Sequence, residues 1–433
     1  MKYLQARNQY FQEIKTAKQT CWNDFLENAD SETVFKAYKY CKQRKLEKTP
    51  IICYNNQKAT SFNDKSKLFL NALLPANSEN TDDSIDSAYF AVNSTNLTDF
   101  CSAEYISDED KWNWPELTKD ELEHAIFSSS TKKAAGPDKT GFLIIHKAYH
   151  TIPDLFYQLY SKLIELGFHP DCWKEEIGVI LKKLNKDDYS SPKSYRLVSL
   201  LNCLGKIAEK IVAERLAFYA ESTDLLHNDQ IGARKNRSAV DAAISLLSDI
   251  ELSKCKKKQP SVLLMDVKGA FPNMNRAQLL KTCCELKFPK ACISWIHSFC
   301  YSRLMKLAFD GEIMENPSTI YTGVPQGSSV SPILFLIYIS KLFKAHSNLS
   351  VRMPNYMDDI AIFASSKSVH ENCQILQNAA EKLIDWGRNH HVEFDMNKTE
   401  LIHFNHAEKS LNESVKIKQH IIKPKEAVKW LGI

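Results

Sequence analysis

A pair of adjacent aspartates beside an apolar run constrains this chain more than any other feature. Tyr356-Met357-Asp358-Asp359 stands directly before Ile360-Ala361-Ile362-Phe363. A short apolar run of this kind predicts a buried strand, so the two carboxylates are expected at one end of a strand. Taken alone, the pair also fits a polar turn that caps a hairpin, because aspartate is common in turns. The rest of the sequence decides between these interpretations.

A second apolar run places a third acid in the same kind of position. The run from Ser261 to Met265 ends at Asp266, and Phe271 follows five residues later. Between the two acidic sites, two glycines and a proline within residues 322–327 predict a loop. Ser331-Pro332 then predicts an N-cap followed by proline at the first helical position, which would open a helix from Ile333 to about Leu342.

Acids at the ends of two strands suit the binding of metal ions to phosphates. Nucleotidyl transfer can use two Mg²⁺ ions to stabilise the attacking and the leaving oxygen. Mg²⁺ is usually held by one or two carboxylates together with substrate phosphates, so Asp266 and Asp358 would suffice as the bridging pair, with Asp359 as a supporting acid. Phe271 is placed to lie under the incoming sugar and exclude a 2′-hydroxyl, which predicts DNA as the product.

These residues resemble the reverse transcriptases of non-long-terminal-repeat (LINE-type) retrotransposons, most closely the Tad-like elements of fungi. A single motif would be a weak indication, whereas six or more in the family's order are a strong one. Besides the acids and the loop, the matching blocks are Ala135–Asp138, Ile180–Lys186, Ser194–Leu201, Gln230–Arg234, Lys398–Leu401 and Trp430–Gly432.

The resemblance implies a role for each block. Lys183 and Arg196 would grip the triphosphate of the incoming dNTP, with Lys182 and Lys186 as alternatives for the lysine. Lys398 would protonate the departing pyrophosphate. The residues expected beside the base pair, the template or the primer are Gln326 and Gly327 under the base pair, Gln230, Gly232, Arg234 and Tyr356 along the template and primer, and Trp430, Leu431 and Gly432 at the start of the primer grip.

The family implies an α+β fold, the fingers and palm of a right-hand polymerase with an antiparallel palm sheet. We expect a helical N-terminal extension over residues 1–75 and a polar linker over 76–110. The fingers and palm would occupy 111–433, with the core reverse transcriptase domain at about 175–433. A capping box at Thr118–Glu121 predicts a helix through Ile126. Compared with full-length elements, we expect a fragment without endonuclease, thumb or RNase H domain, ending at the palm–thumb boundary.

Three departures from the family pattern leave the metal-binding acids and Arg196 intact. Leu197 stands where the family has proline, Pro272 where it has an acid, and Leu184-Asn185 where it has proline-glycine. Two alternatives to an active retrotransposon enzyme stay open. One is a reverse transcriptase of the group II intron maturase type, and the other is an inactive or co-opted fragment that binds RNA or protein without catalysis.

The amino-acid composition is compatible with a reverse transcriptase but does not by itself indicate one. The net charge of +4 is only mildly basic, so nucleic-acid binding would depend on local clusters. The twelve cysteines form no C-x₂-C pair, which argues against a zinc site. Without a secretory signal or an apolar stretch of membrane-spanning length, we expect an intracellular protein of the cytoplasm and nucleus, with the mitochondrion as an alternative. Its expected partners are an RNA template, a DNA primer and dNTPs, with no membrane.

Overall fold

The computed structural model describes residues 2–27, 48–74, 112–184, 186–345, 351–404 and 412–433. They belong to two compact units, Met1–Thr49 and Pro50–Ile433. In the first unit, helix α1 spans Lys2–Glu27, and its described side chains are mostly exposed. The polar linker predicted over 76–110 lies outside the described residues.

The described part of the second unit contains two larger sheets, two short hairpins and a set of helices. None of its described helices, nor α1, is both long enough and apolar enough to cross a membrane. The α-helices among the described residues of this unit are α3 (Phe62–Leu73), α5 (Lys119–Phe127), α6 (Phe142–Thr151), α7 (Pro153–Leu166), α8 (Cys203–Ser222), α9 (Ala239–Cys255), α10 (Arg276–Glu285), α11 (Lys290–Cys300), α12 (Ser331–Ala345) and α13 (Val369–Asn389).

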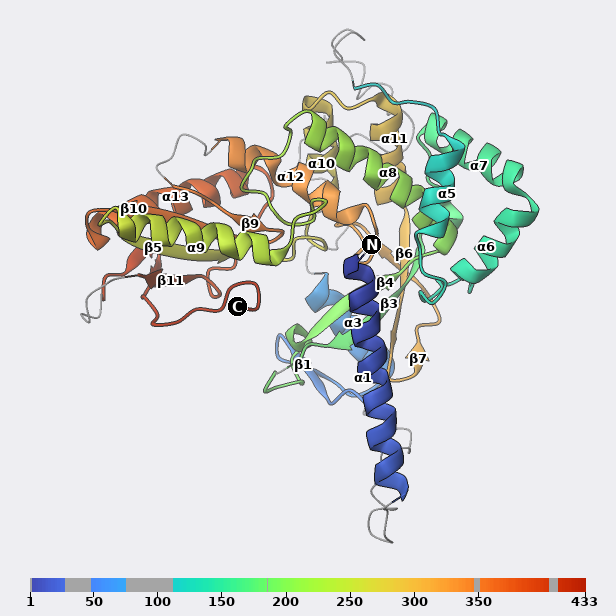
Figure 1. The fold of residues 1–433 in the computed structure, drawn as a ribbon, viewed down its shortest axis with the longest axis horizontal. Helices are drawn as coiled ribbons and strands as arrows, with labels where there is room; N and C mark the ends of the chain where they lie inside the picture. The colour runs from blue at the N-terminus through green and yellow to red at the C-terminus, as the bar shows by residue number, and fades with distance from the viewer. Residues whose placement is uncertain (1, 28–47, 75–111, 185, 346–350, 405–411) are drawn as a thin grey trace. The chain divides into compact units, whose positions relative to one another are not determined.

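The first sheet of this unit, which we call the palm sheet, is antiparallel throughout. Its strand order is β11-β5-β10-β9 (Figure 1). The strands are β5 (Gln259–Asp266), β9 (Asn355–Tyr356), β10 (Asp359–Ser366) and β11 (Glu400–His403). The α+β fold with an antiparallel palm sheet, predicted from the sequence, is confirmed.

The palm sheet is buried on both faces, which explains why its strands are continuously apolar. Val262 and Leu264 of β5 belong to one hydrophobic cluster with the inner side of α9. Leu263 and Met265 point the opposite way and join a larger cluster that includes α13. This is the alternation that a strand imposes on successive side chains. Figure 1 shows α9 and α13 running alongside the palm strands.

The second sheet, which we call the finger sheet, has the strand order β4-β3-β6-β7, and β8 also pairs with β6. Strand β3 is antiparallel to β4 and parallel to β6. Helix α3 covers this sheet, because its Phe69 shares a buried cluster with Tyr195 and Leu307. The strands are β3 (Glu175–Lys182), β4 (Tyr195–Leu200), β6 (Arg303–Phe309), β7 (Glu312–Ile313) and β8 (Ser318–Ile320).

The stretch predicted as a helical extension over residues 1–75 is only partly helical. Strands β1 (Ile52–Tyr54) and β2 (Gln57–Ala59) form a hairpin ahead of α3. Its two turn residues, Asn55 and Asn56, have φ angles of 47° and 62°, which asparagine adopts more readily than most residues. The hairpin and α3 pack on the finger sheet and so belong with the fingers. A short hairpin, β12 (Val415–Ile417) with β13 (His420–Ile422), lies near the C-terminus.

The helix starts were predicted with mixed success. At α5 the capping box is present, because Thr118 Oγ1 accepts a hydrogen bond from Glu121 N at 3.2 Å and Glu121 Oε2 accepts one from Thr118 N at 3.1 Å. At α12 the predicted N-cap is wrong, since Ser331 is already the first helical residue. Its hydroxyl instead donates to Pro325 O at 2.8 Å, which ties the preceding loop to the helix.

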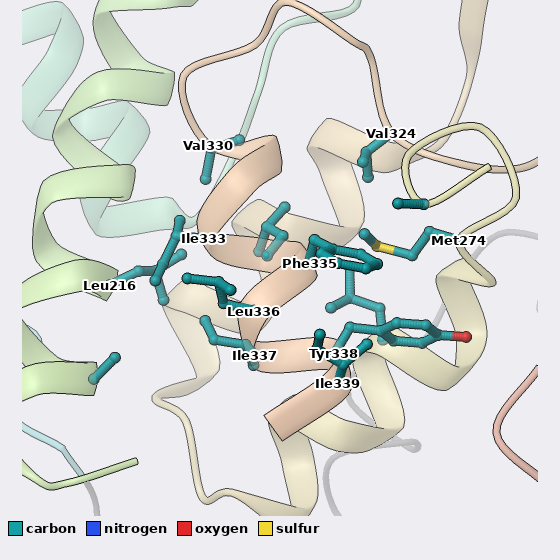
Figure 2. Close-up of a cluster of buried hydrophobic side chains, with 14 of the residues drawn as sticks. Leu216, Met274, Val324, Val330, Ile333, Phe335, Leu336, Ile337, Tyr338 and Ile339 are labelled. Carbon is teal, nitrogen blue, oxygen red and sulfur yellow. The ribbon is translucent and has the colours of Figure 1, made fainter. Parts of the chain in front are cut away.

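Helix α12 is the centre of the main hydrophobic core. Every residue from Ile333 to Ile339 is at most 5% exposed, so the helix is apolar around its whole circumference. Figure 2 shows its side chains meeting Leu216 of α8 on one side and Met274, from the loop before α10, on the other. Because α12 continues directly from the 322–330 loop, its burial in the core fixes where that loop ends.

Candidate active site

The three aspartates singled out in the sequence come together at one end of the palm sheet. Strands β5 and β10 are antiparallel neighbours, and their register pairs Asp266 with Asp359. Asp358 precedes β10, and its carbonyl oxygen accepts a hydrogen bond from Val267 N at 2.9 Å. Strand pairing therefore brings three aspartates together at one end of the sheet, although they lie almost a hundred positions apart in the sequence.

The turn between β9 and β10 is held in a conformation that few residues adopt. Met357 has φ = 62°, as tight two-residue hairpin turns require. Asn355 stabilises this turn, because its Nδ2 donates to Met357 O at 2.6 Å and its side chain is fully buried. A non-glycine residue at positive φ persists only where its surroundings enforce it, and the Asn355 hydrogen bond is one of the contacts that hold the turn next to Asp358.

A second segment supports the turn from below. Ile231 N and Gly232 N both donate to Asn355 O, at 2.9 and 3.3 Å. A Cβ atom at Gly232 would lie 2.5 Å from Met357 N, so only glycine leaves room for the turn. Gly232 was predicted to contact the template, and the structure places it directly against the turn that carries Asp358.

Gln230 and Arg234, also predicted to contact the template, do not present their side chains to one. Gln230 is fully buried, and its Nε2 donates to Leu336 O at 3.1 Å. The side chain of Arg234 is 6% exposed and donates to Glu221 Oε1 at 2.6 Å. The direct template contact expected of both side chains does not fit this burial. In this structure they brace the segment beneath the turn.

Lys398 joins the aspartates as their cationic partner. Its Nζ donates to Asp266 Oδ2 and lies 3.5 Å from Asp395 Oδ2. Asp395 N in turn donates to Asp266 O at 2.9 Å, which anchors the segment carrying Lys398 at the end of β5. Lys398, predicted as a catalytic residue, therefore lies in direct contact with the acidic cluster.

The acids destabilise one another's charged forms. Burial, followed by the charges of Asp358 and Asp266, raises the pKa of Asp359 to about 6. Burial and the Asp266 charge also raise the pKa of Asp358, although Lys398 acts in the opposite direction. For Lys398, burial lowers the pKa, but the hydrogen bond and charge of Asp266 outweigh it and the net shift is upward. The acidic cluster is therefore electronegative, and Lys398 is a positively charged side chain in contact with it.

These carboxylates fit a divalent cation even though the ligand set is not preformed. Among the residues described, no three His, Cys, Asp or Glu side chains are close enough together to hold a metal ion. Mg²⁺ needs only one or two protein carboxylates when substrate phosphates supply other ligands. Burial and the neighbouring carboxylates raise the pKa values of Asp358 and Asp359 despite the charge of Lys398, and the positive charge of a divalent ion would favour their ionised forms.

Four basic side chains line a cavity of about 300 Å³ beside the finger sheet: Lys183, Arg196 and the buried Arg276 and Arg303. Lys183 directly follows the last residue of β3, and Arg196 is the second residue of β4. Gln326 lines the same cavity. Burial lowers the pKa of Lys183, and the charges of Lys398, Lys186 and Arg196 lower it further. Because Lys398 and Asp266 act on Lys183, the finger lysine lies within electrostatic range of the palm acids. The alternative lysines, Lys182 and Lys186, are exposed.

The loop containing Gln326 and Gly327 is joined to the finger sheet. Ser199 N donates to Gln326 O at 2.8 Å, and a Cβ atom at Gly327 would lie 2.7 Å from Ser199 O. Gln326 and Gly327 are both exposed residues, as contact with a nucleotide requires. Phe271 is partly buried, and its ring centroid lies 6.0 Å from that of Phe335 in α12.

The predicted primer-grip residues form a tight turn at the end of the chain. Trp430 and Ile433 exchange two backbone hydrogen bonds of 3.0 Å, with Leu431 and Gly432 at φ angles of 54° and 89°. Trp430 is buried in the cluster that α9 forms with the palm sheet, and Tyr356 packs against the same cluster. The turn and Tyr356 therefore border the same face of the palm sheet.

Sequence reasoning did not assign a role to Asn355 or Asp395. Asn355 adjoins the acidic tetrapeptide, and a buried amide beside a turn is a recognisable pattern only once the turn is known. Asp395 is three residues before Lys398, a spacing at which the two charges can pair, but nothing in the sequence links it to Asp266.

A family model describes this arrangement. Residues 181–433 match the model "Reverse transcriptase (RNA-dependent DNA polymerase)". The chain belongs to the reverse transcriptase family. The matched region contains the three aspartates, Lys398, both finger residues and the Gln326 loop, so it includes every part of the site described above.

Several curated proteins are similar to this reverse transcriptase chain. The RNA-directed DNA polymerase from mobile element jockey of Drosophila melanogaster is 25% identical over 437 residues, covering 96% of this chain and 45% of that protein. The Pol polyprotein from type-1 retrotransposable element R1 of Bradysia coprophila is 23% identical over 435 residues, covering all of this chain and 41% of that protein. The chain thus spans less than half the length of these relatives.

Among solved structures, apo telomerase from Candida tropicalis, truncated from its C-terminal domain, aligns with 64% of this chain and 59% of its own. The TM-score is 0.41 and the sequence identity 12%. The family model shows to which family the chain belongs, and the strand pairing shows its fold.

Proposed function

We propose that this chain is the RNA-directed DNA polymerase core of a non-LTR retrotransposon. It would transfer a nucleotidyl group from a dNTP to the 3′-hydroxyl of a primer annealed to an RNA template. The observation that carries this proposal is the pairing of Asp266 with Asp359 across β5 and β10, with Asp358 in the adjoining turn. The relatives named as RNA-directed DNA polymerases support the same reaction.

The palm residues would hold two Mg²⁺ ions and supply a proton. Asp266 and Asp358 would bind the ions and Asp359 would support them, and bound Mg²⁺ would stabilise the attacking and leaving oxygens of the displacement. The raised pKa of Lys398 keeps its ammonium group protonated near neutral pH, so it can donate a proton to the departing pyrophosphate.

The finger residues would bind and select the nucleotide. Arg196 is exposed at the cavity and offers a planar fork that binds a phosphate through two hydrogen bonds, while Lys183 adds a second positive charge. The Gln326–Gly327 loop would lie under the base pair. Phe271 would contact the sugar and leave no room for a 2′-hydroxyl.

We also infer that the element is most like the Tad-like group of fungi. This narrower assignment rests on the overall resemblance of the motif blocks, whereas Ser194–Leu201 and Lys268–Phe271 look LINE-type and favour a retrotransposon enzyme over a maturase-type reverse transcriptase. A phylogenetic tree of reverse transcriptase domains tests it, because a position among the arthropod elements, away from the fungal ones, would contradict it.

Primer extension on an RNA template tests the proposed activity. The natural chain, Asp358→Asn and Asp385→Asn should be compared with Mg²⁺ and labelled dNTPs. Asp385 is an exposed aspartate of α13 that pairs with Lys418 at 2.7 Å, so its variant controls for the loss of a carboxylate elsewhere. We expect extension by the natural chain and by Asp385→Asn, and none by Asp358→Asn.

Two outcomes would contradict the proposal. Full activity of Asp358→Asn would remove this residue from the metal site. No extension by the natural chain, with binding of the primer–template retained, would favour a protein that binds nucleic acid without catalysis.

A further inference from the structure

Two separate segments carry the residues that would select the nucleotide, and their backbones are bonded to each other. Phe271 precedes α10, and Gln326 follows β8. Val324 N donates to Phe271 O at 2.9 Å, and Gly323 N donates to Met274 O at 2.9 Å. The two segments therefore form one structural unit beneath the proposed dNTP site.

Arg276, the first residue of α10, fastens this unit from the inside. It is 1% exposed. Its Nε donates to Gly323 O at 2.9 Å, its Nη1 to Ile320 O at 2.9 Å and its Nη2 to Thr322 O at 3.0 Å. One guanidinium thus binds three carbonyl groups of the segment that leads into the Gln326 loop.

The two segments are closely packed at Gly323. Gly323 has φ = 73°, and a Cβ atom there would lie 2.5 Å from Pro272 O and 2.6 Å from Phe271 O. Met274 and Val324, one from each segment, both face the core around α12 near Phe335 (Figure 2). Arg276 therefore adds three side-chain hydrogen bonds to the backbone bonds and close packing that hold Phe271 near the Gln326 loop.

We propose that Arg276 is a positioning residue that sets the discrimination between deoxyribonucleotides and ribonucleotides. This inference rests on the polymerase function proposed above. A steric gate rejects a 2′-hydroxyl only if the distance between the gating ring and the residues holding the base is fixed, because a site loose by about 1 Å admits the larger sugar. Arg276 supplies that rigidity through its three carbonyl partners, from the wall of the cavity that Lys183 and Arg196 also line.

The substitution Arg276→Lys tests this role. A lysine ammonium keeps the charge but cannot reach three carbonyls with a fixed fork. Arg215→Lys is the matched control, because Arg215 is also buried and donates to Pro115 O at 2.7 Å and to Glu121 Oε1 at 2.8 Å, on another part of the core. Both variants lose buried arginine bonds, but only one of them borders the proposed site.

The measurement is kcat/KM for dTTP and for UTP in primer extension by the natural chain and each variant. For Arg276→Lys we expect the dTTP-to-UTP ratio to fall by roughly tenfold, with most of the change in KM and little in kcat for dTTP. For Arg215→Lys we expect a lower melting temperature and an unchanged ratio. An unchanged ratio in a folded Arg276→Lys protein would overturn the inference.

A second variant and a second readout keep the inference testable if Arg276→Lys does not fold or the chain does not polymerise. Gly323→Ala should separate the same two segments and lower the ratio in the same direction. Hydrogen exchange at the Gly323 and Val324 amides should accelerate in Arg276→Lys and not in Arg215→Lys. Absence of synthesis by the natural chain would refute the polymerase function, and unchanged exchange would refute the role of Arg276.

Discussion

In the absence of metal, the ionised side chain of Asp359 should destabilise the folded protein. Its pKa in the folded protein is about 6, against an ordinary value of 3.8. At about 1.4 kcal/mol per pKa unit, this difference corresponds to roughly 3 kcal/mol of destabilisation once the group is ionised. Because the side chain is only half-buried, solvent screening reduces the expected effect to about 1–2 kcal/mol. Asp359→Asn should therefore raise the free energy of unfolding of the metal-free protein by about that amount.

The effect has a defined pH dependence. Below about pH 4 the carboxyl group is protonated in both the folded and the unfolded chain, and it causes no penalty. Between pH 4 and pH 6 the folded chain retains a proton that the unfolded chain loses, so stability falls as pH rises. Above pH 6 the group is ionised in both states and the penalty is constant. The gain from Asp359→Asn should follow this curve.

Urea unfolding in EDTA, followed by tryptophan fluorescence at pH 8 and near pH 4, measures the gain. Asp385→Asn is the control, since it removes an exposed carboxylate and should change stability by no more than about 1 kcal/mol, in the destabilising direction. Added Mg²⁺ should stabilise the natural chain more than Asp359→Asn. A destabilised Asp359→Asn protein at pH 8, or an equal gain at both pH values, would refute the reasoning.

Three further predictions concern the supports of the site and the core. Gly232→Ala should reduce DNA synthesis by at least roughly tenfold without unfolding the protein, because the new Cβ displaces the turn at Met357; an unchanged rate at normal circular dichroism would contradict this. Arg303→Met should cost about 3–5 kcal/mol in urea unfolding, because it leaves Glu176 charged and buried, and adding Glu176→Gln should restore most of it; additive losses would rule out the pair. Burial raises the pKa of the Cys292 thiol, so Cys292 should resist thiol reagents in the native protein and react only in denaturant, as mass spectrometry of labelled peptides would show.

The sequence was sufficient to predict the acidic site because its strands are apolar on both faces. A strand buried on two sides contains a continuous apolar run, and such a run makes the acid at its end conspicuous. Asp266 and Asp358-Asp359 were found in this way, and the antiparallel register places them side by side. Helix α5 was predictable for a related reason, since its capping box is encoded within four consecutive residues.

The remaining features depend on contacts that a sequence pattern does not contain. Gln230 and Arg234 lie in a recognisable block, but the pattern does not indicate whether a polar side chain faces a template or bonds to the protein interior. The β1–β2 hairpin was missed because its strands have only three residues each. Arg276 is the first residue of an ordinary helix, and its three partners lie 44 to 47 positions later in the chain.

The two sheets are interleaved along the chain, and this governs how the protein can fold during synthesis. Strands β3 and β4 of the finger sheet are made first, β5 of the palm sheet follows, and only then does β6 arrive to pair with β3. The palm sheet must in turn wait for β10 and β11. Neither sheet is complete within a contiguous piece, so a nascent chain that has emerged as far as β5 exposes the edge of β3 that later pairs with β6, together with the unpaired strand β5. We expect slow acquisition of structure, because pairing between distant strands bears the entropic cost of closing long loops.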